Sequence, residues 1–135
     1  MTPTPDATAT GSADPPDGTP IRITIGTLVL TGRLHDNPTA RDLLTQLPLT
    51  LSFRDLNGVE KIARLPRALT MKGVPVGDDP EIRDIGYYAP TRNLVLYYGD
   101  VGYWNGIVRI GRYDGSIEPV QGLDDGAVVT IERAG

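Results

Sequence analysis

The sequence predicts a mainly β domain: a closed eight-stranded barrel with one or two short capping helices. Short β-type runs, broken by glycine, proline and Asn-Gly, fill the chain from Ile21 onward. There are eight such runs, and eight strands suit a closed barrel, which leaves no exposed sheet edge. One segment that begins with proline instead carries apolar residues at helical spacing.

The first 20 residues differ in composition from the rest. They hold five of the 12 prolines and no Ile, Leu, Val or aromatic residue. Such a segment buries too little apolar surface to offset the entropy of ordering it, so we expect residues 1–20 to be a disordered arm. Residues 21–135 then form one domain. Its net charge is -1 rather than -4 once Asp6, Asp14 and Asp17 are set aside, which argues against nucleic-acid binding.

The strands are indicated by alternation and by turn residues. Ile21, Ile23 and Ile25 alternate with polar residues, as in a half-buried strand. Asn57-Gly58 is a strong hairpin signal, because both turn residues must tolerate positive φ. The same patterns predict strands over residues 21–25, 28–34, 49–54, 59–64, 85–88, 93–98, 107–113 and 127–132.

A helix is predicted over residues 38–46. Asn37 can cap it, Pro38 suits its first turn, and Pro48 ends it because the residue before proline avoids the α conformation. We expect this helix to close one end of the barrel, and we predict a second, shorter helical turn over residues 66–70.

Several classes of site and location are disfavoured by the sequence. The absence of cysteine excludes disulfides, thiolate metal sites and a cysteine nucleophile. The lone His35 is expected at the surface, and the acidic run at residues 78–84 in a solvated loop, so we expect no metal and no cofactor. No apolar run reaches the ~20 residues of a membrane span. We expect a cytoplasmic protein, with export behind a cleaved leader as the alternative.

Three segments carry a resemblance to a known family. They are Asn37-Pro38-Thr39-Ala40 with the leucines that follow, Asp84 to Pro90 with the strand at residues 93–98, and Trp104-Asn105-Gly106 with the strand at residues 107–112. Together with the order of elements, they resemble the cyclophilin fold. The match is closer to a bacterial and archaeal cyclophilin-like family without established activity than to the prolyl isomerases. The resemblance covers about residues 21–134 and implies a bacterial protein.

The resemblance also raises prolyl isomerisation. In cyclophilins an arginine inside a Phe-His-Arg stretch, on the strand after the first hairpin, assists this reaction, and Arg64 is the match chosen here. Lys61 and Ile62 do not reproduce the residues before that arginine, and the Phe-Met-x-Gln-Gly-Gly and Phe-Ala-Asp-Glu segments have no counterpart. We therefore expect Arg64 to be at most a weak catalytic candidate and the protein to be non-catalytic.

The aromatic residues give the main candidate site. Seven of the eight lie between Tyr87 and Tyr113. Neighbours in a strand face opposite sides, so each Tyr-Tyr pair should place one ring inward and one outward; the sequence leaves open which ring does which. Outward rings supply contact area at low entropic cost. The predicted ligand contacts are Tyr88, Tyr98, Tyr103, Trp104 and Arg64.

Three functions remain in order of preference. The first is a non-catalytic module that binds a peptide or small molecule in an aromatic-lined groove. The second is a structural or interaction domain whose aromatic face pairs with another protein or a second copy of the chain. The third is a divergent peptidyl-prolyl isomerase that uses Arg64.

Overall fold

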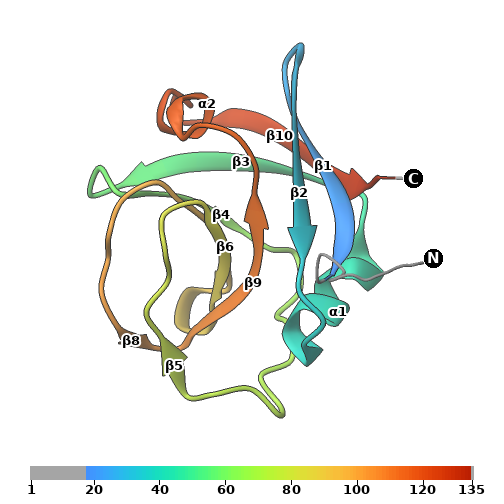
Figure 1. The fold of residues 1–135 in the computed structure, drawn as a ribbon, viewed down its shortest axis with the longest axis vertical. Coiled ribbons are helices and arrows are strands. Elements are labelled where there is room, and N and C mark those ends of the chain that lie inside the picture. The colour runs from blue at the N-terminus through green and yellow to red at the C-terminus, as the bar shows by residue number, and fades with distance from the viewer. Residues whose placement is uncertain (1–17, 135) are drawn as a thin grey trace, which may run out of the picture.

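The computed structural model describes residues 18–134, and the predicted closed barrel of eight antiparallel strands is confirmed (Figure 1). The barrel strands are β1 (Thr19–Ile25), β2 (Leu28–Leu34), β3 (Leu49–Leu56), β4 (Glu60–Arg64), β6 (Asp84–Tyr88), β7 (Asn93–Tyr97), β9 (Ile107–Tyr113) and β10 (Ala127–Arg133). They follow one another around the barrel in the order β1-β10-β3-β4-β7-β6-β9-β2. A separate two-stranded ribbon pairs β5 (Gly77–Asp78) with β8 (Trp104–Asn105).

The first strand begins slightly earlier than predicted. Thr19 pairs with Leu34, so β1 includes two residues that the sequence assigned to the arm. The predicted disorder of the arm otherwise falls on residues 1–17, which lie outside the described residues.

The predicted Asn-Gly turn joins β3 to β4. Asn57 and Gly58 have φ values of 57° and 67°, the left-handed conformation that a tight hairpin turn requires. The Gly58 amide also donates to the Asp55 carboxylate at 2.9 Å. The local sequence therefore sets the register of this hairpin.

Side chains fill the inside of the barrel. Apart from Lys61 of β4, the buried inward residues of the strands are apolar or aromatic, and the largest fully buried ones include Phe53, Tyr87 and Tyr113. The two tyrosine hydroxyls are not left unpaired: Tyr87 accepts the Leu69 amide at 3.1 Å, and Tyr113 donates to the Tyr97 carbonyl at 2.5 Å. The interior is a packed core, as expected for a barrel of this strand number.

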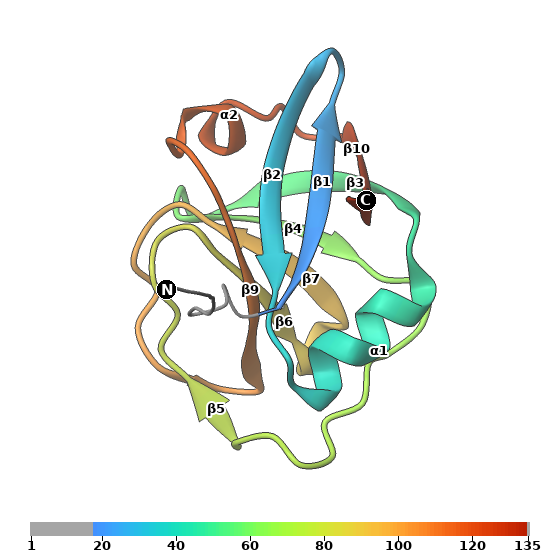
Figure 2. The same cartoon turned by 45° about the vertical axis from the view of Figure 1, so that its right-hand side comes forward.

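Two helices lie at opposite ends of the barrel (Figure 1 and Figure 2). The predicted helix α1 (Pro38–Gln46) is confirmed, with the Asn37 side chain accepting the Ala40 amide at 2.8 Å and Leu43 buried. The short α2 (Glu118–Gln121), which the sequence did not predict, buries Val120. Within residues 18–134, no helix has the length and apolar character that crossing a membrane requires.

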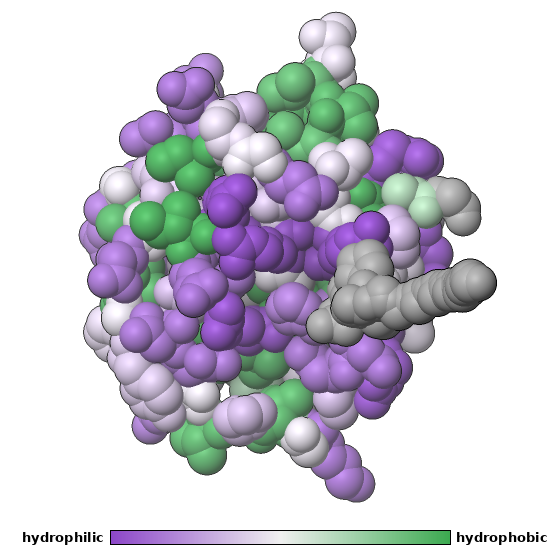
Figure 3. Space-filling model, in the orientation of Figure 1, coloured by the Kyte–Doolittle hydropathy of each residue, from purple (hydrophilic) through white to green (hydrophobic). Residues whose placement is uncertain are grey.

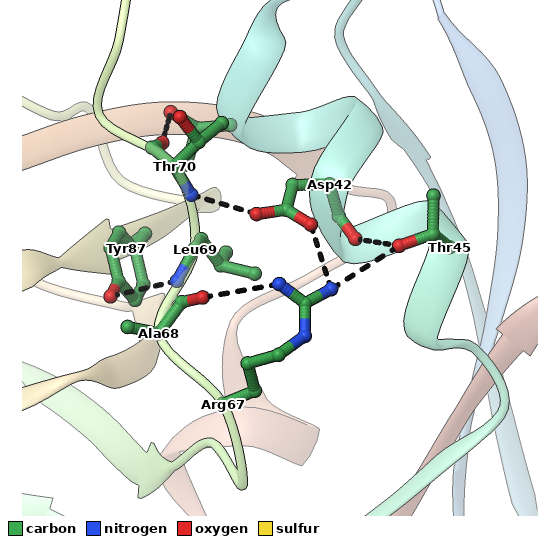
Figure 4. A network of polar contacts seen from close by, with 8 residues as sticks. Asp42, Thr45, Arg67, Ala68, Leu69, Thr70 and Tyr87 are labelled. Carbon is green, nitrogen blue, oxygen red and sulfur yellow. Dashed lines mark hydrogen bonds and ion pairs between the residues drawn. The ribbon is translucent and has the colours of Figure 1, made fainter.

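The helical turn predicted at residues 66–70 is wrong, because that segment contains no helix. Contacts to distant residues hold its backbone instead (Figure 4). Asp42 of α1 accepts the Thr70 amide at 2.7 Å and pairs with Arg67 at 2.9 Å. Leu69 donates to the Tyr87 hydroxyl. Tertiary contacts thus replace the i→i+4 bonds that a helix would have made.

The hairpin of β1 and β2 projects beyond the barrel. Only Gly32–Leu34 of β2 pair with β9, so the outer half of β2 pairs with β1 alone. Leu28 and Val29 are exposed there, and Figure 3 shows an apolar patch close to the tip of the hairpin.

Candidate binding pocket on the outer wall of the barrel

The outer wall of β4, β7 and β6 is laid out in rows by the strand register. Residues that pair across neighbouring strands point to the same side, and alternate rows face outward. The outward rows are Glu60–Tyr97, then Ile62–Val95–Gly86, then Arg64–Asn93–Tyr88.

The ring of Tyr97 lies directly on Gly86. A Cβ atom built on Gly86 would stand 2.6 Å from Cε2 of Tyr97 and 3.1 Å from its hydroxyl oxygen. Tyr97 packs with Ile62 and Val95 in a small cluster separate from the barrel core. Because Gly86 has no side chain, the Tyr97 ring can lie against the backbone of β6 on the outer wall.

A pocket of about 310 Å³ opens above this ring. The segment between β7 and β9 crosses over the wall and supplies Val101 and Trp104. The indole N–H of Trp104 donates to the Val101 carbonyl at 2.9 Å, which fixes the orientation of the tryptophan ring. The pocket lining consists of Leu56, Asn57, Val59, Glu60, Tyr88, Tyr97, Val101, Trp104 and Ile107.

A close approach of backbones anchors the far side of the pocket. Gly106, with φ of +94°, donates to the Val76 carbonyl at 2.8 Å and accepts the Ala89 amide at 3.0 Å. Ala89 opens η1 (Ala89–Thr91), directly after Tyr88. These bonds hold the Trp104 segment against the end of β6, so the rings of Trp104 and Tyr88 border a pocket built by backbone pairing.

Two of the five predicted contact residues, Tyr88 and Trp104, line the pocket together. Tyr103 is 60% exposed and lies outside the lining, with its hydroxyl oxygen 2.8 Å from the place a Cβ would take on Gly77. Tyr98 and Arg64 also lie elsewhere. The binding role of all five residues stays a prediction.

Tyr98, one of the predicted contact residues, points into the barrel, and Tyr97 points outward, which the sequence had left open. Leu94, Leu96 and Tyr98 share the inward parity, and all three belong to the main core. The Tyr98 hydroxyl donates to the Asp55 carboxylate, and burial followed by that carboxylate raises the pKa of Tyr98 to about 12. The prediction that each Tyr-Tyr pair has one inward and one outward ring is confirmed for both pairs. Leu94 and Leu96, which alternate with Tyr97, were the signal that could have shown that Tyr98 points inward.

Glu60 is a pocket residue that sequence reasoning missed. Its side chain is half-buried, and among residues 18–134 its carboxylate has no hydrogen-bond or ion-pair partner. Burial and then the negative charge of Asp55 raise the pKa of Glu60. The pKa of the facing Tyr97 is also raised, mostly by burial and next by the negative charge of Glu60. The pocket is thus aromatic and apolar with one carboxylate.

Arg64 lies on the same outer wall but in another groove of about 720 Å³, which Ser52, Arg54 and Asn93 also line. The strand after the β1–β2 hairpin is β3, which carries Arg54, whereas Arg64 is the last residue of β4. Neither arginine lines the aromatic pocket.

The acidic run at residues 78–84 is tied to its own loop and to β9 by hydrogen bonds and ion pairs. Asp84 is buried, accepts the Glu81 amide at 2.7 Å and pairs with Nε of Arg109 at 2.7 Å. In the described part of the chain, no group of three or more His, Cys, Asp or Glu residues is placed to hold a metal ion. Asp84 therefore closes a loop onto β9.

Comparison with known proteins places the chain in a family. A model of the Cyclophilin-like family matches residues 23–132. The solution structure of a hypothetical protein from Archaeoglobus fulgidus is similar in fold, with a TM-score of 0.69 and 22% identity over 87% of this chain and 95% of that one. No curated protein matches. The chain belongs to the Cyclophilin-like family.

Proposed function

We propose that this protein is a non-catalytic binding module that holds part of a peptide, or a small molecule, in the pocket on its outer wall. The observation that carries the proposal is the pocket itself, with the rings of Tyr88, Tyr97 and Trp104 around one cavity. Ligand pockets are concave and largely apolar, with few polar groups, and span roughly 300–1,000 Å³. At about 310 Å³, this pocket suits one side chain or a small planar group.

The rings are supported before any ligand arrives. Tyr97 is 1% exposed and rests on Gly86, and Trp104 is fixed by its bond to Val101. A ligand therefore does not have to order these side chains, which is a large cost of binding at mobile surfaces. By contrast, 56% of Trp104 is open to solvent, so a face of this ring is available for contact.

Fluorescence tests the proposal directly, since Trp104 is the single tryptophan. A library of small aromatic and aliphatic compounds and short peptides is titrated into the full chain. We expect a saturable change in Trp104 emission that Tyr88→Ala weakens. The matched control Tyr103→Ala, which removes an exposed ring outside the pocket, should leave the affinity unchanged. A library without saturable binding, or binding lost in Tyr103→Ala and kept in Tyr88→Ala, would refute the proposed pocket.

An interaction domain is the second candidate. Trp104 of β8 is exposed, as are Val76 and Tyr103, which directly precede β5 and β8. Exposed apolar groups of this kind occur at protein interfaces. If a second copy covers this ribbon, the hydrodynamic mass will exceed 14.5 kDa and will fall when Tyr103 is replaced by Ser. A monomer at millimolar concentration would exclude self-association.

A divergent isomerase is the third candidate, and the geometry gives it least support. Catalysis requires an arginine beside the bound proline ring, whereas Arg54 and Arg64 lie in the neighbouring groove. A prolyl-peptide assay with Arg54→Ala and Arg64→Ala decides the point. Rate enhancement that either variant abolishes would establish this activity in place of the binding module.

A further inference from the structure

The aromatic pocket has a charge that nothing nearby neutralises. Glu60 is its one charged lining residue, and in the described chain no hydrogen bond or ion pair reaches the Glu60 carboxylate. The other polar lining groups are the Asn57 amide and the hydroxyls of Tyr88 and Tyr97. A carboxylate removed from water is costly unless it is paired, so this lining lacks a positive partner.

Basic side chains close in sequence turn away from the pocket. Lys61 follows Glu60 but points into the barrel, where its Nζ donates to the Leu123 carbonyl at 2.7 Å and pairs with Asp55 at 3.2 Å. Arg54 and Arg64 face the neighbouring groove. None of these cations lines the pocket, which leaves the place beside Glu60 free for a cation from outside.

The aromatic rings favour the same kind of ligand. The face of an aromatic ring is negative, and cations bind within about 6 Å of its centre, most strongly on tryptophan. Tyr88, Tyr97 and Trp104 surround the cavity that Glu60 also lines. Aromatic cages are a known way to hold quaternary ammonium ions, and here a carboxylate lines the same cavity.

We propose that the pocket selects a positively charged organic group: the ammonium or guanidinium end of a side chain, or a small alkylammonium molecule. This inference rests on the proposed function, because it names the chemistry of the ligand for the same pocket. Glu60 supplies the charge, Tyr88 and the 56% exposed Trp104 supply aromatic surface, and the buried Tyr97 completes the lining. The cavity of about 310 Å³ fits the end of a lysine or arginine side chain.

The charge of Glu60 makes this binding depend on pH. Glu60 pairs in register with Tyr97 of β7 and lines the pocket with Tyr88 of β6, and Asp55 of β3 adds negative charge. Burial and Asp55 raise the pKa of Glu60. A cation favours the ionised carboxylate, so its affinity should fall as the pH drops through this raised pKa, whereas the affinity of a neutral ligand should not change.

A charged probe and a neutral probe of the same shape test the inference. Choline and 3,3-dimethyl-1-butanol differ only in a quaternary nitrogen replaced by carbon, and both are titrated against Trp104 fluorescence in the full chain. We expect choline to bind more tightly. Glu60→Gln should weaken choline about tenfold, the size of losing one hydrogen-bonded or paired charge, and should leave the alcohol unchanged. The matched control Glu118→Gln, on exposed α2, should change neither.

Two further arms separate the outcomes. N-acetyl-lysine amide against N-acetyl-norleucine amide tests whether a peptide side chain is the source of the cation. Glu60→Asp, which keeps the charge one methylene further back, should weaken choline and retain its preference over the alcohol. Equal binding of choline and the alcohol, or full choline affinity in Glu60→Gln, would overturn the charge selection while leaving pocket binding intact. If neither these probes nor the library bind, the proposed function itself fails.

Discussion

Replacing Gly86 by alanine tests whether the outer pocket depends on one missing side chain. The φ of Gly86 lies outside the left-handed region, so its backbone accommodates alanine. On backbone grounds alone, Gly→Ala should then stabilise the protein by about 0.4–1 kcal/mol, because the unfolded chain loses freedom. The added Cβ, however, would stand 2.6 Å from Cε2 of Tyr97.

The contact with Tyr97 should reverse the sign of the change. Tyr97 is 1% exposed and packed against Ile62 and Val95, so its ring has little space to retreat. Overpacking of this kind costs roughly 1–3 kcal/mol. After the backbone gain is subtracted, the net cost of Gly86→Ala spans about 0–2.6 kcal/mol. We expect a value near the midpoint, about 1.3 kcal/mol, which lowers Tm by roughly 4–7 °C for a domain of this size.

Urea unfolding of four proteins measures this effect: wild type, Gly86→Ala, Tyr97→Leu and the double variant. Leucine lacks the ring atoms that meet the new Cβ, so Gly86→Ala should cost much less in the Tyr97→Leu background. The difference is the coupling energy of the pair. An equal cost in both backgrounds, or a stabilising Gly86→Ala in the wild type, would refute the account of Tyr97 resting on Gly86.

Three further changes follow from the charged groups. Burial raises the pKa of Glu60, so ionisation of its carboxyl opposes folding. Glu60→Gln should therefore raise Tm at pH 7. This gain in Tm should vanish once the pH falls below 4.5, the pKa of an unperturbed glutamate. Lys61→Ala leaves the one-third exposed Asp55 without its buried partner and should cost about 2–3 kcal/mol in urea, less in an Asp55→Ala background. Burial works to raise the pKa of Asp42, but hydrogen bonds from Arg67 and a backbone amide lower it. Asp42→Asn should therefore reduce Tm at pH 7, with the difference shrinking as the pH falls below 3.8.

Each of these changes has an outcome that contradicts it. A Glu60→Gln gain that persists at acidic pH would come from packing rather than charge. Additive losses for Lys61→Ala and Asp55→Ala would show that the two side chains act independently. If the Tm difference for Asp42→Asn does not change with pH, the loss comes from a change in packing or hydrogen-bond geometry and not from the charge of Asp42.

The strands and the first helix were predictable because their signals are local. Ile21 to Ile25 alternate over one strand, and Asn57-Gly58 encodes its own turn conformation. Asn37 likewise caps its own helix. In each case the residues that specify the element lie within it or beside it, so no knowledge of distant contacts is needed.

The segment at residues 66–70 could not be predicted in this way. Leu65 and Leu69 are four residues apart and both are buried, a spacing that indicates a helix. Their burial comes instead from an extended segment tied to Asp42 and Tyr87, 18 to 28 residues distant in sequence. A helical period and an anchored loop give the same local pattern here.

The candidate site was predictable in residue type more than in residue position. The cluster of tyrosines and Trp104 pointed to residues that line the outer cavity, and strand alternation gave one outward ring per pair. The contribution of Glu60 depends on β4 pairing with β7, which places it beside Tyr97. Such a cross-strand neighbour leaves no mark in the local sequence.

The location of the pocket follows from the size of the barrel. Eight strands enclose just enough space for side chains, and here Phe53, Tyr87 and Tyr113 occupy it with their polar atoms paired. An interior of this kind contributes stability and leaves no place for a ligand. The pocket lined by Tyr88, Tyr97 and Trp104 is instead on the outer wall. There the Tyr97 ring lies over Gly86, which has no side chain, and the segment carrying Val101 and Trp104 covers the ring. The barrel core and the proposed pocket therefore lie on opposite faces of the same strands, and Tyr97, the last residue of β7, and Tyr98, directly after it, belong to different clusters.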